Sequence, residues 1–208
     1  MGLFDSIRSI FGTSAEADAT RAADPEDLFG MSTAYLTMAA DLGCPSAGEA
    51  ALCFSNVDST DFASTVEEVE TILDAGKEET GTDHWRHSDD YGYHWFVLHD
   101  EDPEDLVTSV HFAADEFVER GYGSRLLAAL FAFERDGDDG GGRDGYVYWV
   151  YSFRRGAYYP FVPTGTSSRD SKREFKLQAV LDGELTVEDD EGYWYPLWPD
   201  RAGQHPWE

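Results

Sequence analysis

Cysteine, lysine and long apolar runs are scarce in this sequence. Its 208 residues include only two cysteines, Cys44 and Cys53, and no CxxC motif. A disulfide framework and a thiolate zinc site are therefore not indicated, and a reducing compartment fits. No segment approaches the roughly 18 apolar residues of a transmembrane helix, and the first twelve residues lack the basic start and continuous apolar stretch of a secretion signal. These absences predict a cytoplasmic protein.

Positive charge is also scarce. The chain has 15 Lys and Arg against 42 Asp and Glu, a formal net charge of -27. The acids are spread along the chain, which is typical of a carboxylate-covered surface adapted to concentrated salt, because salt screens their repulsion. Nucleic acid is disfavoured as a ligand because phosphate binding needs a basic footprint. With 41% hydrophobic and 14% aromatic residues the chain can build a core, unlike a disordered acidic tail.

The amino-terminal segment, residues 1–12, has an amphipathic pattern. Its apolar side chains share one face of a helix: Leu3, Phe4, Ile7, Ile10 and Phe11. Such a helix can lie on a membrane, dock on a partner helix or fold back onto its own domain, and the sequence leaves these three open. Small and acidic residues follow to about residue 24 and predict a linker. We expect a single folded domain over residues 25–208.

Periodicity and turn residues predict an α+β domain. Helices are expected over about 32–42, 61–75, 103–120 and 168–181, the third with Asp102 as its cap. Strands are expected at 51–54 and on both sides of the turn at 89–92. A meander of three more is expected within 125–133, 146–153 and 157–161. This mixture predicts an antiparallel sheet built from hairpins, with helices packed mainly on one face.

Five histidines fall within 28 residues, and they raise the question of a metal site. They are His84, His87, His94, His99 and His111. If His87 and His94 face each other across the hairpin, they suit a transition metal, and a small metal-dependent hydrolase is the alternative function. However, His84 and His87 are three residues apart on a strand and so lie on opposite faces, and no HExxH spacing occurs. We therefore expect no metal, no cofactor and no catalytic residues.

A basic island over residues 154–176 departs from the charge balance of the chain. It holds six of the fifteen cations, Arg154, Arg155, Arg169, Lys172, Arg173 and Lys176, against Asp170 and Glu174 only. Aromatic residues are interleaved with them. The island either receives an acidic helix or a phosphate-bearing partner, or pairs with the protein's own carboxylates. As partner-binding residues the sequence predicts Arg154, Arg155, Tyr158, Tyr159, Phe161 and Arg169.

Segments along nearly the whole chain resemble the PspA-associated PspAB family, in its halophilic archaeal type. The matching segments are MGLFDSIRSIFG, LFGMSTAYLTMAADLG, DDYGYHWFVL, LVTSVHFAADEFVERGYGSRLLAALFAF, YVYWVYSFRRGAYYPFVPTG and ELTVEDDEGYWYPLW. The most specific piece is YYPFVPTG, followed by Arg169 and Asp170. The acidic, glycine-rich loop at 134–145 departs from the family pattern.

The resemblance implies association with PspA, a coiled-coil protein that protects and remodels stressed membranes, and with an HtpX-type membrane protease. It supplies no catalytic residues. We therefore expect a non-enzymatic accessory protein of the PspA membrane-stress response, with peripheral contact at the inner face of the membrane. The sequence does not indicate an oligomeric state.

Overall fold

The structure is a computed structural model that describes residues 22–135, 145–165, 167–198 and 206–207. Its helices are α3 (Gly30–Leu42), α4 (Thr60–Thr80), α5 (Pro103–Glu119) and α6 (Ser171–Leu181). The strands are β1 (Ser46–Ser55), β2 (Asp83–Ser88), β3 (Tyr93–His99), β4 (Leu126–Glu134), β5 (Tyr146–Ser152) and β6 (Ala157–Phe161). Short 3-10 helices occur at η1 (Pro25–Phe29), η2 (Gly123–Arg125) and η4 (Glu191–Tyr193). None of the described helices is long and apolar enough to cross a membrane.

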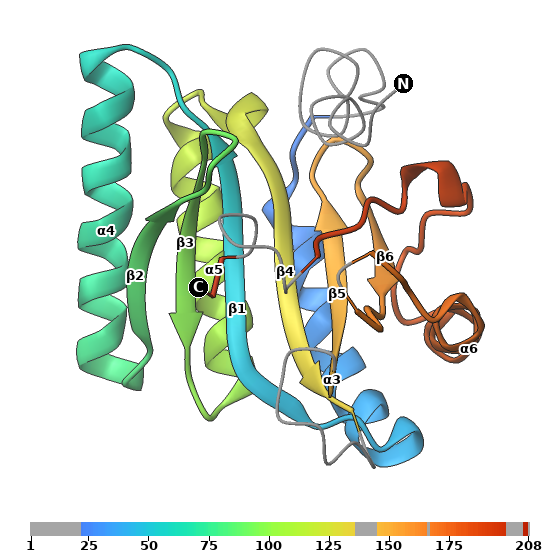
Figure 1. The fold of residues 1–208 in the computed structure, drawn as a ribbon. Coiled ribbons are helices and arrows are strands. Elements are labelled where there is room, and N and C mark those ends of the chain that lie inside the picture. The colour runs from blue at the N-terminus through green and yellow to red at the C-terminus, as the bar shows by residue number, and fades with distance from the viewer. Residues whose placement is uncertain (1–21, 136–144, 166, 199–205, 208) are drawn as a thin grey trace.

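The strands form one six-stranded sheet with the order β2-β3-β1-β4-β5-β6. Every neighbouring pair is antiparallel, and β4, β5 and β6 form the expected meander. Helices α3 and α5 lie behind the sheet, with α4 beside β2 and α6 beyond β6 (Figure 1). The predicted α+β class, with an antiparallel sheet and helices mainly on one face, is confirmed.

The two faces of the sheet are buried by different parts of the chain. Along β1, Leu52 and Phe54 point into the core shared with the helices, whereas Ala51 and Cys53 belong to a second core. This alternation follows from the two-residue period of a strand. The second core is closed by residues of the carboxyl-terminal segment: Trp194, Leu197, Trp198 and Trp207. The sheet is therefore buried on both faces, by helices on one and by aromatic tail residues on the other.

Short polar side chains begin the helices. Asp102 accepts a hydrogen bond from Glu104 N, as predicted for α5, and Asp170 accepts one from Arg173 N at the start of α6. Helix α6 therefore begins three residues later than expected. Helix α3 follows η1, which is capped by Asp24, so it begins before Ser32.

Helix α4 continues past Gly76 to Thr80 and is capped by Gly81, where φ is 91°. A single glycine inside a helix costs only about 1 kcal/mol, whereas the left-handed conformation at Gly81 ends the helix. Strand β1 is longer than the four residues expected. The predicted amphipathic helix over residues 1–12 and most of the loop at 134–145 lie outside the described residues.

Candidate partner-binding site

Arg155 of the basic island is a structural cation. It lies in the turn between β5 and β6, where its Nε donates to Glu188 Oε2 at 2.6 Å. Its guanidinium carbon also lies 3.9 Å from the centre of the Tyr193 ring. Glu188 is buried, and its backbone N donates to Tyr158 O. Arg155 therefore links the β5–β6 turn to the carboxyl-terminal segment after α6, which contains Glu188 and Tyr193 and is called the tail below. Arg154 lies half-buried in the same turn.

Arg169 is the centre of an internal network. Its Nε donates to both Glu174 carboxylate oxygens, at 2.9 and 2.8 Å, and its Nη1 donates to Trp194 O at 2.9 Å. Glu174 is 1% exposed and also accepts from Val162 N at 2.8 Å. Burial raises the pKa of Glu174, while the Arg169 and Val162 hydrogen bonds oppose that rise. The network joins α6, the end of β6 and the tail. The Arg169 guanidinium is therefore already engaged by hydrogen bonds within the protein.

The aromatic residues of the island are core residues. Tyr158, Tyr159 and Phe161 are 1%, 2% and 0% exposed. The Tyr158 hydroxyl donates to Leu28 O at 3.2 Å on the helix side, and the Phe161 ring lies 5.2 Å from Trp198 on the other. Burial also raises the pKa values of both tyrosine hydroxyls.

The expectation that these aromatic side chains offer an exposed binding surface is therefore wrong. Strand β6 is covered on both faces, and Tyr158 N donates to Thr186 O at 2.8 Å along its outer edge. A strand buried on both faces reads as a continuous apolar run. In the sequence this run is indistinguishable from an aromatic patch on the surface.

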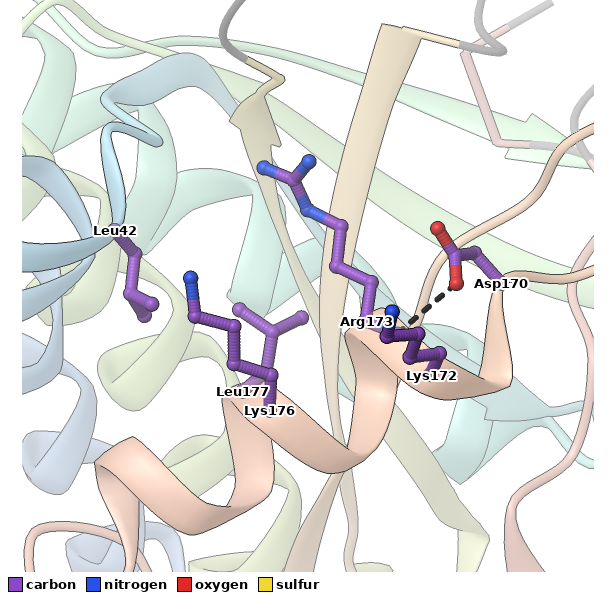
Figure 2. Close-up of a pocket in the computed structure, with 6 residues that line it drawn as sticks. All are labelled: Leu42, Asp170, Lys172, Arg173, Lys176 and Leu177. Atoms are coloured by element: carbon purple, nitrogen blue, oxygen red, sulfur yellow. Dashed lines mark hydrogen bonds between the residues drawn. The ribbon is translucent and has the colours of Figure 1, made fainter.

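The other three cations of the island line a groove. Lys172, Arg173 and Lys176 project from the first half of α6 beside a cavity of about 620 Å³, which Leu42, Asp170 and Leu177 also line. Figure 2 shows these side chains and, across the opening, Leu42 at the end of α3. Residues four apart share a helix face, so Lys172 and Lys176 lie one turn apart on the same side. We call this feature the α6 groove.

The charge balance of the α6 groove is unusual for this chain. None of the ion pairs between described residues includes Lys172, Arg173 or Lys176. Ion pairs are formed instead by cations such as Lys77, Arg86, Arg120, Arg135, Arg155 and Arg169. Thus three cations gather without a described carboxylate partner in a chain whose net charge is -27.

Asp170, the one carboxylate among the described residues that line the groove, is already engaged. Asp170 accepts from Arg173 N at 3.0 Å as the helix cap, and its other oxygen lies 3.8 Å from Arg135 Nη2. Arg173 Nη2 donates to the sulfur of buried Cys44 at 3.2 Å, which holds the guanidinium toward α3.

The arrangement of the groove suits an acidic group. A guanidinium can donate two parallel hydrogen bonds to a carboxylate or phosphate, and two ammonium groups add point charges. The groove also lies at the positive end of the α6 dipole. Half-buried Leu42 provides apolar contact beside these cations, whereas Leu177 at the base of the groove is 1% exposed.

Lys172, Arg173 and Lys176 belong to the basic island, but they are not among the partner-binding residues that the sequence predicts. The sequence does not show which of the six cations form ion pairs with buried carboxylates, because those pairs depend on the fold. The i, i+4 spacing of the two lysines was the available signal.

The β2–β3 hairpin carries His87 and His94, the two histidines of the metal-site alternative. His87 pairs with Trp95, and His94 pairs with Ser88. His87 and His94 therefore point to opposite faces of the sheet, so the arrangement on which the metal-site alternative depended does not occur. The reason is the register set by the four-residue turn at 89–92.

His94 has a packing role in this structure. Its Nδ1 lies 2.8 Å from Ser88 Oγ, and its ring stacks on Phe54 at 5.6 Å between centroids. Burial, with a smaller effect from Arg86, lowers the pKa of His94 against the opposing effect of Asp89. Within the described residues, no group of three or more His, Cys, Asp or Glu side chains is arranged to hold a metal. The structure gives the hydrolase alternative no support.

The comparisons with known proteins identify the family. A family model described as PspA associated protein B matches residues 1–207. The chain belongs to this family. Comparison with curated proteins and with solved structures finds no match. The family description implies association with PspA, which is consistent with an accessory role.

Proposed function

We propose that this member of the PspA associated protein B family is a non-enzymatic accessory protein of the PspA membrane-stress response. It binds PspA, or an associated component such as an HtpX-type membrane protease, through the α6 groove. The supporting observation is that Lys172, Arg173 and Lys176 gather there without a described carboxylate partner. This placement replaces the buried aromatic residues of the island with two exposed lysines and the half-buried Arg173 of the same segment.

The proposed ligand is an acidic segment of the partner. The net charge of -27 opposes an acidic partner at long range, so the attraction has to act within the groove. At high ionic strength only pairs closer than a few ångströms escape screening. Contact of apolar partner atoms with Leu42 and paired hydrogen bonds from Arg173 then carry much of the affinity.

The proposed location is the cytoplasm, with peripheral contact at the inner face of the membrane through the partner. The family description supports it through PspA. The charge pattern supports it as well, since a carboxylate-covered surface is repelled by anionic lipid and a partner is needed to bring it there.

A charge-reversal experiment tests the proposal. Lys172→Glu combined with Lys176→Glu should reduce recovery of PspA, or of the other stress component, at least about tenfold in pull-downs from stressed cells in high salt, a loss typical of removing two binding contacts. The matched control is Lys77→Glu with Arg120→Glu, which changes the net charge equally. Both control side chains are about half-exposed, and they lie on α4 and just after α5. Equal recovery with the two double variants would contradict the proposal.

A further inference from the structure

Helix α3 stands apart from the other helices by its lack of charge. Only Asp41 is charged among its thirteen residues, whereas α4 has eight charged residues in twenty-one. Leu36, in the middle of α3, is 71% exposed. A surface helix with one charged residue and an exposed leucine is unexpected in a chain so rich in carboxylates.

Two exposed phenylalanines extend this surface. Phe29 directly precedes α3 and is 40% exposed, and Phe112 of α5 is 51% exposed. Both rings contact His111, at 4.5 and 5.5 Å between centroids. Phe29 and Leu36 are seven residues apart, so they share a helix face about 10 Å apart along the axis. We call Phe29, Thr33, Leu36 and Phe112 the α3 apolar face.

The chemistry of this face restricts its occupant. An acidic segment would lose hydration there without gaining a cation. An apolar segment of low charge has little charge hydration to lose, and it would remove the exposed rings and Leu36 from water. Residues 1–12 have that character, because their only charged side chains are Asp5 and Arg8.

Length and attachment favour the same segment. As a helix, twelve residues span about 18 Å, close to the roughly 20 Å length of the thirteen-residue α3. The nine residues at 13–21 can extend over about 30 Å. They join the described chain a few residues before Phe29, near Asp24, whose carbonyl accepts from the Tyr151 hydroxyl at 3.4 Å. A short tether of this kind gives an effective concentration in about the millimolar range, which favours this segment over a second molecule.

We infer that the α3 apolar face is the docking site of the chain's own amphipathic segment, residues 1–12. The segment places Leu3, Phe4, Ile7, Ile10 and Phe11 against Phe29, Leu36 and Phe112. The same side chains then cannot contact a membrane, so docking and membrane contact exclude each other. This inference does not depend on the α6 groove or on the proposed function.

Disulfide cross-linking of the full chain tests the inference. Ile7→Cys combined with Leu36→Cys should form an intramolecular disulfide under mild oxidation, seen as a faster-migrating monomer and confirmed by peptide mapping. The matched control is Ser9→Cys with Leu36→Cys, because Ser9 lies on the polar face of the segment and should cross-link at least about fivefold less. Native Cys44 and Cys53 are buried and should not compete.

Each outcome of this experiment is decisive. Cross-links between molecules would assign the α3 apolar face to a second copy and overturn the inference, as would equal or absent cross-linking of Ile7 and Ser9. A second measurement uses the native cysteines only. Leu36→Glu should speed hydrogen exchange of residues 1–12, and unchanged exchange would also contradict docking.

Discussion

At the residue scale, the cations of one sequence island have different roles, set by what each contacts. Arg169 binds the buried carboxylate of Glu174, whereas Lys172, three residues further on, is exposed and has no ion pair with a described residue. Removing one partner of a buried pair leaves a charge in a medium that solvates it poorly, and removing an exposed cation does not. Stability measurements should therefore separate residues that the sequence groups together.

Arg169→Ala should lower the free energy of unfolding by about 3–5 kcal/mol, because it leaves the Glu174 carboxylate without its cation. Lys172→Ala should stay within about 0.5 kcal/mol of the native chain. Denaturant unfolding at fixed salt measures both. Equal effects would contradict the division of the island into structural and exposed cations.

The pH dependence of this loss has a definite sign. Burial already raises the pKa of Glu174, and without Arg169 less opposes that rise. A carboxyl group with a raised folded pKa favours the folded state at low pH and loses that contribution as pH rises. The difference in free energy of unfolding between Arg169→Ala and the native chain should therefore become smaller as the pH falls from 7 toward the unfolded pKa of glutamate.

At the element scale, local signals predicted most of the fold. The Asp102 cap, the turn at 89–92 and the meander needed only short-range patterns, and each lies where expected. Errors occurred where tertiary structure decides. The helix predicted to end at residue 75, before Gly76, continues to Thr80, because a glycine inside a helix is tolerated when the helix continues on both sides.

The site was harder to predict than the fold. The sequence predicted Tyr159 and Phe161 as binding residues. It does not show that Trp194 and Trp198, much later in the chain, pack over β6 and bury them. Burial on the second face depends on contacts more than thirty residues apart in the chain. The same long-range information decides which cations find carboxylates.

The tail is predicted to be essential for the second core. Trp194 is 4% exposed and its indole N donates to Glu188 O at 2.8 Å. Trp194→Ala should cost about 3–5 kcal/mol, as for other buried large side chains. Phe175→Ala is the control, since Phe175 neighbours Trp194 but is 44% exposed and should cost less than about 1 kcal/mol. Thermal unfolding compares the two, and similar losses would show that the tail does not close a core.

For the whole molecule, we expect the net negative charge to have the largest effect on how stability depends on salt. The net charge of -27 is spread over the chain, so carboxylates repel one another at low salt. We propose that the protein is adapted to concentrated salt. The melting temperature should rise steeply between about 0.1 and 3 M KCl, over which the Debye length falls from roughly 10 Å to below 3 Å. A flat curve would contradict the adaptation, and repetition with NaCl would show whether the cation matters.

Titration calorimetry with purified PspA measures directly whether the α6 groove binds a component of the PspA system. We expect saturable binding of the full chain at high salt. The Kd should be at least about tenfold higher for Lys172→Glu with Lys176→Glu, and unchanged for Lys77→Glu with Arg120→Glu. If PspA and an HtpX-type protease both fail to bind the native chain, or if both double variants bind equally well, the groove is not the binding site.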